Sequence, residues 1–220
     1  MPKEITDADV ELVDQAFAEV WGLGVRVAEC ETDAVWFRGL LAGLLNSTLR
    51  EYQHLKLGLR MSTALLAWAC RNLLELNIYV QYVLKSEANA RRFAGERLAD
   101  GVDIFDSFQA WAARNDPSLV TPAVDAALNS LIELKAQEES APGRPMSTRY
   151  VSAEVGLADE YANMNKVCLK LIRPTAFSVL AGDDEGELAL LRPVLFRSGA
   201  GHGLEIVQAV RQHLDPLWHQ

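Results

Sequence analysis

Two opposite charges stand inside the most apolar stretch of the sequence, residues 61–84. Arg71 and Glu75 are four residues apart, a spacing at which two helix side chains meet on one face. A guanidinium suits phosphate and carboxylate groups, and a carboxylate can take up a proton, so the pair is a candidate functional site. We favour the structural alternative, in which the two residues pair and fix the helix register. We predict that they are buried together.

The same side of this predicted helix carries aromatic side chains at helical spacing, while the opposite face is purely apolar. A helix with this pattern is expected to be buried on both sides. A second predicted helix, residues 151–172, is followed directly by Arg173, at a position where free carbonyls and the helix dipole favour a cation. Together the two segments give the candidate polar cluster: Arg71, Asn72, Glu75, Tyr79, Tyr82, Asn165, Lys166 and Arg173.

Glu51 and His54 form a Glu-x-x-His motif, the spacing found in the metal sites of di-iron helical bundles. Such a site needs two of these motifs and two further glutamates, and the sequence contains one motif. We therefore favour a hydrogen-bonded or surface histidine and predict no metal and no cofactor. His202, His213 and His219 have no nucleophile beside them in the sequence, and we assign them no catalytic role.

Composition narrows the class of protein. The chain has 220 residues, half of them apolar, which suits a single folded domain. The formal net charge of -9 argues against broad nucleic-acid binding, whose affinity rests on basic residues. Three widely spaced cysteines predict free thiols in a reducing compartment, and no secretory signal or membrane span is recognisable. We expect a cytoplasmic protein.

Cap and turn signals divide the chain into about seven or eight helices, so the fold class predicted is an all-α multi-helix bundle. Pro174 and the glycine-rich residues 198–203 are predicted to interrupt helices, and residues 140–147 to form a mobile loop. The helices are expected at about residues 6–27, 32–59, 62–84, 86–114, 121–139, 151–172 with a break at Gly156, 185–195 and 204–214.

Residues 71–93 and 165–176 resemble a family of uncharacterised bacterial all-helical proteins, a domain of unknown function. The first segment begins Arg-Asn-Leu-Leu-Glu. In the second, the family usually reads Asn-Lys-x-x-Ser-Lys-x-x-His-Pro-Thr-Ala, and here Leu169 replaces the serine and Arg173 the histidine. The resemblance implies an all-helical fold and no established activity.

The chain is more loosely similar to HEPN-type domains, many of which are dimeric ribonucleases of bacterial defence and toxin systems. Those enzymes use an Arg-x(4 to 6)-His motif. After Arg71 the candidate position holds Asn77, and the spacing from Arg50 to His54 is one residue too short. Without a histidine, the sequence offers no clear general base.

These observations leave three hypotheses. The first, which we favour, is a non-catalytic interaction module that forms a homodimer and has a possible protein partner. The second is an HEPN-like ribonuclease or a degenerate relative of one. The third is a small-ligand or metal binder in the bundle core, suggested by Glu51 and His54.

Overall fold

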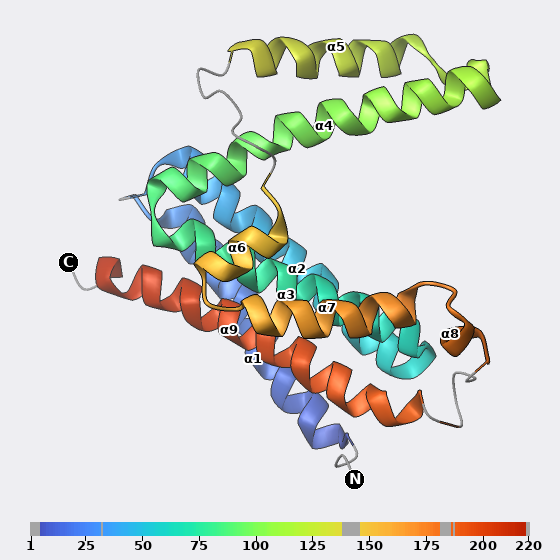
Figure 1. Cartoon of the computed structure of the whole chain (residues 1–220). Helices are drawn as coiled ribbons and strands as arrows, with labels where there is room; N and C mark the ends of the chain where they lie inside the picture. The colour runs from blue at the N-terminus through green and yellow to red at the C-terminus, as the bar shows by residue number, and fades with distance from the viewer. Residues whose placement is uncertain (1–4, 32, 138–145, 181–185, 187, 219–220) are drawn as a thin grey trace. The chain divides into compact units, whose positions relative to one another are not determined.

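The computed structural model describes residues 5–31, 33–137, 146–180, 186 and 188–218. Every regular element in these residues is a helix, which confirms the predicted all-α multi-helix fold (Figure 1). No helix in this part of the chain is both long and apolar enough to cross a lipid bilayer. In chain order the elements are α1 (Asp7–Glu29), α2 (Val35–Met61), α3 (Thr63–Lys85), α4 (Glu87–Asn115), η1 (Pro117–Leu119), α5 (Pro122–Gln137), α6 (Thr148–Glu154), α7 (Ala158–Ile172), α8 (Ala176–Leu180), η2 (Ala189–Leu191) and α9 (Arg192–Trp218).

The chain forms two compact units. Residues 1–85 and 148–220 make up the first, which we call the core unit. Residues 86–147 make up the second, which we call the hairpin unit. The sequence predicts a single domain, and this stays a prediction. The mobile loop predicted at 140–147 lies, apart from its last two residues, outside the described part of the chain.

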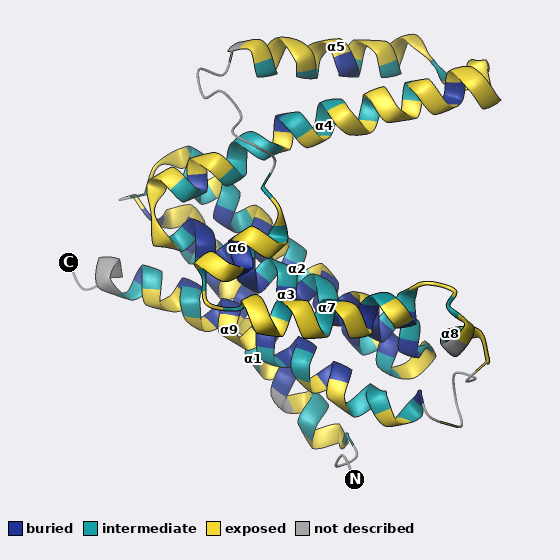
Figure 2. Ribbon diagram, in the orientation of Figure 1, coloured by how far each residue is buried: buried dark blue, intermediate teal, exposed yellow. Residues whose placement is uncertain are grey.

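Helix α3 is the centre of the core unit. It packs against α2, α6, α7 and α9, and Figure 2 shows buried positions along its length. The prediction that this helix is buried on both sides is confirmed only in part, because Arg71, Glu75 and Tyr79 on the aromatic side are partly exposed. Tyr82 is buried on the aromatic side and Leu73 on the apolar side, whereas Trp68 is exposed. The helix that carries Arg71 and Glu75 is therefore held by neighbours around most of its circumference.

Local cap signals set most helix starts. Thr6 begins α1 with a capping box, and the Ser62 and Ser86 hydroxyls accept backbone hydrogen bonds at the starts of α3 and α4. The helix predicted at 151–172 divides at Gly156, whose φ of 80° suits glycine, into α6 and α7. The predicted helix start at Thr32–Asp33 lies partly outside the described residues, because Thr32 is not among them. Helix α2 begins at Val35 without a side-chain cap, and the Asp33 carboxylate instead contacts His213 at 3.0 Å.

The predicted break at residues 198–203 is wrong. Helix α9 runs through this glycine-rich segment without interruption. A Cβ on Gly199 would lie 2.8 Å from Leu55 Cδ1 and 3.2 Å from Cys70 Cα, and one on Gly203 would overlap the Phe17 ring. These glycines allow α9 to approach α1, α2 and α3 closely. Packing of this kind outweighs the roughly 1 kcal/mol that a glycine costs in a helix interior.

The hairpin unit consists of α4, η1 and α5, which pack as two helices. Gly101 of α4 faces Leu131 of α5, and Gln109 Nε2 donates a hydrogen bond of 2.6 Å to Asp125 Oδ1. Few of its described side chains are buried, and Figure 2 shows α4 and α5 mainly as exposed or intermediate. The buried ones are Ala90, Leu98, Ala112 and Leu128.

Candidate functional site

The predicted charge pair forms on α3. Arg71 Nη2 lies 2.7 Å from Glu75 Oε1, one helical turn away. A second helix completes the cluster, because Arg71 Nε donates a hydrogen bond of 2.7 Å to Asn165 Oδ1 of α7. The structure thus joins the two sequence segments that were predicted to matter. We call Arg71, Glu75 and Asn165, with Tyr161 described below, the α3–α7 polar cluster.

Arg71 and Glu75 are less buried than the sequence predicted. The side chains of Arg71 and Glu75 keep 25% and 20% of their surface exposed. Solvent can therefore reach both charged groups, which a ligand would require.

The pKa of Glu75 reflects two opposing effects. Pairing with Arg71 by itself would lower that pKa and make the carboxylate a weaker base. Burial instead raises the pKa of Glu75 above its usual value, outweighing the charge of Arg71 and the hydrogen bonds from Tyr161 and Arg71. A raised pKa makes the Glu75 carboxylate a better proton acceptor than an ordinary glutamate.

Asn72 belongs to a different cluster. Its amide donates a hydrogen bond of 3.0 Å to Glu51 Oε2 on α2, and His54 Nδ1 lies 3.2 Å from the same oxygen. The buried Glu51 carboxylate thus holds α2 to α3. No group of three or more potential ligands that could hold a metal occurs among the described residues. This geometry fits the hydrogen-bonded histidine that the sequence favoured.

The remaining predicted residues do not join the α3–α7 polar cluster. The Tyr79 hydroxyl lies 2.8 Å from Thr148 Oγ1 of α6, and Tyr82 is buried. Lys166 is exposed on α7. Arg173 is the C-cap residue of α7, and its backbone N–H donates a hydrogen bond to the Leu169 carbonyl. The interaction of its side chain with the helix dipole stays a prediction.

Sequence reasoning missed a second polar network, centred on the buried His202 of α9. This histidine is 3% exposed, and its Nε2 lies 3.3 Å from Ser198 Oγ and 3.4 Å from Glu160 Oε1. Its Nδ1 lies 3.5 Å from Glu205 Oε2, which accepts a hydrogen bond from Asn77 of α3. The spacing of Ser198, His202 and Glu205 places them on one helix face. That signal was hidden because the glycines around them predicted a break.

Two thiols meet where α3, α7 and α9 converge. Cys70 and Cys168 are free, buried and hydrogen-bonded to each other. Hydrogen bonds from Cys168, Ser198 and the Gly199 backbone lower the pKa of the Cys70 thiol despite its burial. The hydrogen bond with Cys70, together with burial, raises the pKa of the Cys168 thiol. Because both side chains are fully covered, we interpret the pair as part of the helix packing.

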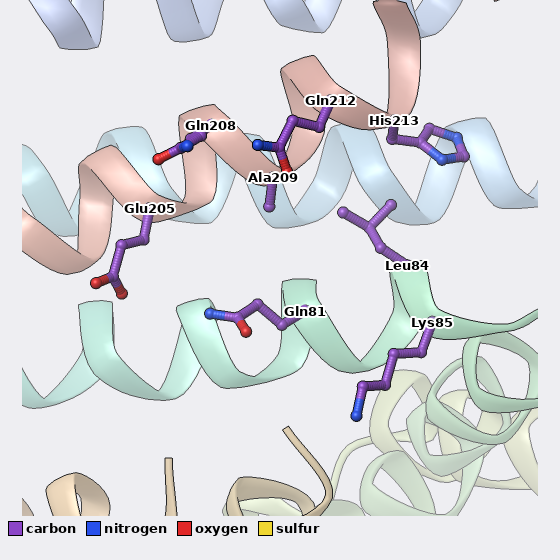
Figure 3. A pocket seen from close by; sticks show the side chains of 8 residues that line it. All are labelled: Gln81, Leu84, Lys85, Glu205, Gln208, Ala209, Gln212 and His213. Carbon is purple, nitrogen blue, oxygen red and sulfur yellow. The ribbon is translucent and has the colours of Figure 1, made fainter. Parts of the chain in front are cut away.

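A groove of about 480 Å³ lies between α3 and α9 (Figure 3). Three glutamines line it, Gln81 from α3 and Gln208 and Gln212 from α9. Glu205 stands at one end and His213 at the other, as Figure 3 shows. Glu205 is held by Asn77 and His202, and His213 by Asp33, so the residues at both ends serve the packing of the core unit.

Comparison with known proteins adds no family. No family model matches the chain, and neither the curated proteins nor the solved structures contain a match. The fold therefore defines the class of protein, an all-α multi-helix bundle. The resemblance to the uncharacterised bacterial family and to HEPN domains stays a prediction.

Proposed function

We propose that this protein is a non-catalytic helical interaction module that acts as a homodimer. The observation that carries the proposal is an apolar stripe on α4. Ile104, Phe108 and Trp111 are spaced by four and three residues, so they share one helix face. Their exposed fractions are 66%, 37% and 50%. We call these three residues the α4 stripe.

The α4 stripe has the character of a binding surface. The rings of Phe108 and Trp111 lie side by side with centroids 6.3 Å apart, and Ile104 continues the surface one turn earlier. Aromatic residues in such positions commonly dominate binding energy. Contiguous exposed apolar patches usually mark partner sites, and two-fold dimers are the commonest oligomer.

The hairpin unit also needs a partner for physical reasons. A unit of about 60 residues must bury most of its apolar surface to be stable. Its two helices bury few side chains against each other and leave the α4 stripe uncovered. Covering the stripe in a dimer would supply the missing core. The three buried free cysteines support the reducing, cytoplasmic setting that we propose for the dimer.

Light scattering over a range of concentrations tests the proposal. We expect a mass of twice the chain's 24.3 kDa that falls toward the monomer on dilution. Trp111→Ser should weaken dimerisation by roughly 30-fold, the effect of a 2 kcal/mol hot spot. Trp21→Ser, which alters an exposed tryptophan on α1, is the matched control and should leave the dimer intact. A monomer at every concentration would overturn the proposal.

A ribonuclease related to HEPN domains is the second candidate, and one observation favours it. Glu75, with its raised pKa, and Arg71 together supply a proton acceptor and a cation suited to phosphate. The net charge of -9 opposes RNA association, and Arg173 cannot accept a proton where the family has histidine.

We expect the pure protein to leave mixed RNA uncut. The assay should compare the parent with Glu75→Gln and with Glu87→Gln, which alters an exposed glutamate on α4. Cleavage by the parent and by Glu87→Gln that is lost in Glu75→Gln would put the ribonuclease first.

A further inference from the structure

We infer that α4 packs antiparallel against α4 of a second copy, about a two-fold axis between Ser107 and Phe108. This inference rests on the homodimer proposed above and names its interface. The surface involved is the α4 stripe together with two charged side chains, Asp100 and Arg114, that border it.

The α4 stripe is self-complementary in this arrangement. Ile104 and Trp111 are seven residues apart, or roughly 10 Å along a helix, and Phe108 lies between them. An antiparallel partner brings Ile104 against Trp111 of the partner subunit at both ends of the stripe. The two Phe108 rings meet near the axis. Each large indole is thus matched by a smaller aliphatic side chain, which is how close-packed interfaces fill space.

Charge selects the direction of pairing. At 100° per residue, Asp100 and Arg114 fall on the same flank of the α4 stripe, and both are exposed. In an antiparallel pair related by a two-fold axis, the same flank of each helix faces the other helix, and the two helices run in opposite directions. Arg114 therefore lies opposite Asp100 of the partner subunit. A parallel pair would bring this flank against the opposite flank of the partner helix, so neither ion pair would form.

A second copy suits this surface better than a different protein does. The apolar centre and the charged flank both match their own reversed copies, which is the requirement of an isologous two-fold interface. Two hairpin units joined through α4 supply four helices, the number that forms a common stable bundle with a shared core.

A charge-exchange experiment tests the pairing directly. Asp100→Arg and Arg114→Glu should each weaken the homodimer, by about threefold to thirtyfold for two exposed ion pairs at low salt. An equal mixture of the two single variants should associate more tightly than either variant alone, because both contacts of the heterodimer are then complementary. The double variant should regain the parental affinity. Mixing also separates lost contacts from lost folding, because a misfolded chain gains nothing from its partner.

Cross-linking locates the axis. With a short bis-maleimide, Ser107→Cys should form dimers readily, because residue 107 lies beside the axis. Ala113→Cys, on the opposite face of α4, is the matched control and should remain largely monomeric on denaturing gels. The native cysteines are buried and contribute little background.

The outcomes distinguish the two levels of the proposal. A dimer by light scattering that shows neither the mixing effect nor preferential cross-linking at residue 107 would overturn this interface and leave the homodimer standing. A protein that is monomeric throughout would overturn both.

Discussion

Helices α3 and α4 are both long, yet the two units use them in opposite ways. Helix α3 is surrounded by four other helices, and twelve of its residues are buried. Helix α4 is longer but buries three residues and exposes an apolar stripe. The core unit therefore completes its packing within one chain, whereas the hairpin unit leaves a face that another surface can cover.

The same contrast separates two ion pairs of similar local geometry. Arg71 and Glu75 on α3, and Glu87 and Arg91 on α4, are both spaced by four residues with N–O distances of 2.7 Å. Arg71 and Glu75 are 25% and 20% exposed and are tied to α7, while Glu87 and Arg91 are 69% and 58% exposed. An identical sequence spacing thus gives a structural cluster in one unit and a solvated pair in the other.

Truncation of a core leucine should have the largest effect on stability. We expect Leu73→Ala, on the fully buried side of α3, to lower the free energy of unfolding by about 2–5 kcal/mol. Leu134→Ala, at an exposed position of α5, should change it by less than about 0.5 kcal/mol. Chemical denaturation at a dilution where the protein is monomeric measures both. Equal losses would show that the two units are packed alike.

The glycines of α9 should give the next largest effect. Gly203→Ala places a methyl group against the Phe17 ring, which cannot move freely because it stacks on Tyr52 at 3.6 Å. We expect a loss of about 1–3 kcal/mol. Gly201→Ala, two residues earlier and with open space around it, should instead stabilise α9 by roughly 0.5–1 kcal/mol. Thermal unfolding of both variants tests this, and a stable Gly203→Ala would contradict the close approach of α9.

Removal of Arg71 from α3 should lower the free energy of unfolding by less than the removal of one partner from a fully buried ion pair would. Complete burial implied about 3–5 kcal/mol for Arg71→Ala. Since both partners are partly exposed, we expect about 1–3 kcal/mol, the range for hydrogen bonds to charged groups. Arg91→Ala on α4 is the matched comparison and should cost under about 0.5 kcal/mol. Urea titrations that rank the two variants in the reverse order would refute the contrast between the pairs.

The pH dependence of stability should give the smallest effect. Because burial raises the pKa of Glu75, the folded state binds its proton more tightly than the unfolded state does. The resulting stability is present below the usual pKa of 4.5 and is lost as pH rises through the folded-state pKa. Glu75→Gln should therefore flatten a decline in stability above about pH 4.5. A decline that persists unchanged in this variant would rule out Glu75 as its cause.

Asp14 provides the opposite case within the core unit. Hydrogen bonds from Lys56 and Tyr52 lower the pKa of Asp14 below its usual value of 3.8. Its contribution is present above pH 3.8 and is lost as pH falls through the folded-state pKa. Asp14→Asn should thus alter the acid side of the same stability profile and leave the region above about pH 5 unchanged in shape.

The sequence by itself determined the features that depend on neighbouring residues. The hydroxyls of Thr6, Ser62 and Ser86 marked helix starts, and Gly156 and Pro174 marked helix ends. The spacing of Arg71 and Glu75 specified their pairing. These signals need only local hydrogen bonds and side-chain sterics, so they can be read within one helical turn.

Tertiary structure alone decided which distant groups meet and how far water reaches them. It brought Asn165 to Arg71, turned Asn72 toward Glu51, and raised the pKa of Glu75. It also kept α9 helical through Gly199 and Gly203, because close helix packing outweighed the local preference of glycine for a break. Burial and long-range contact arise from the placement of whole helices, which depends on all the packed side chains together.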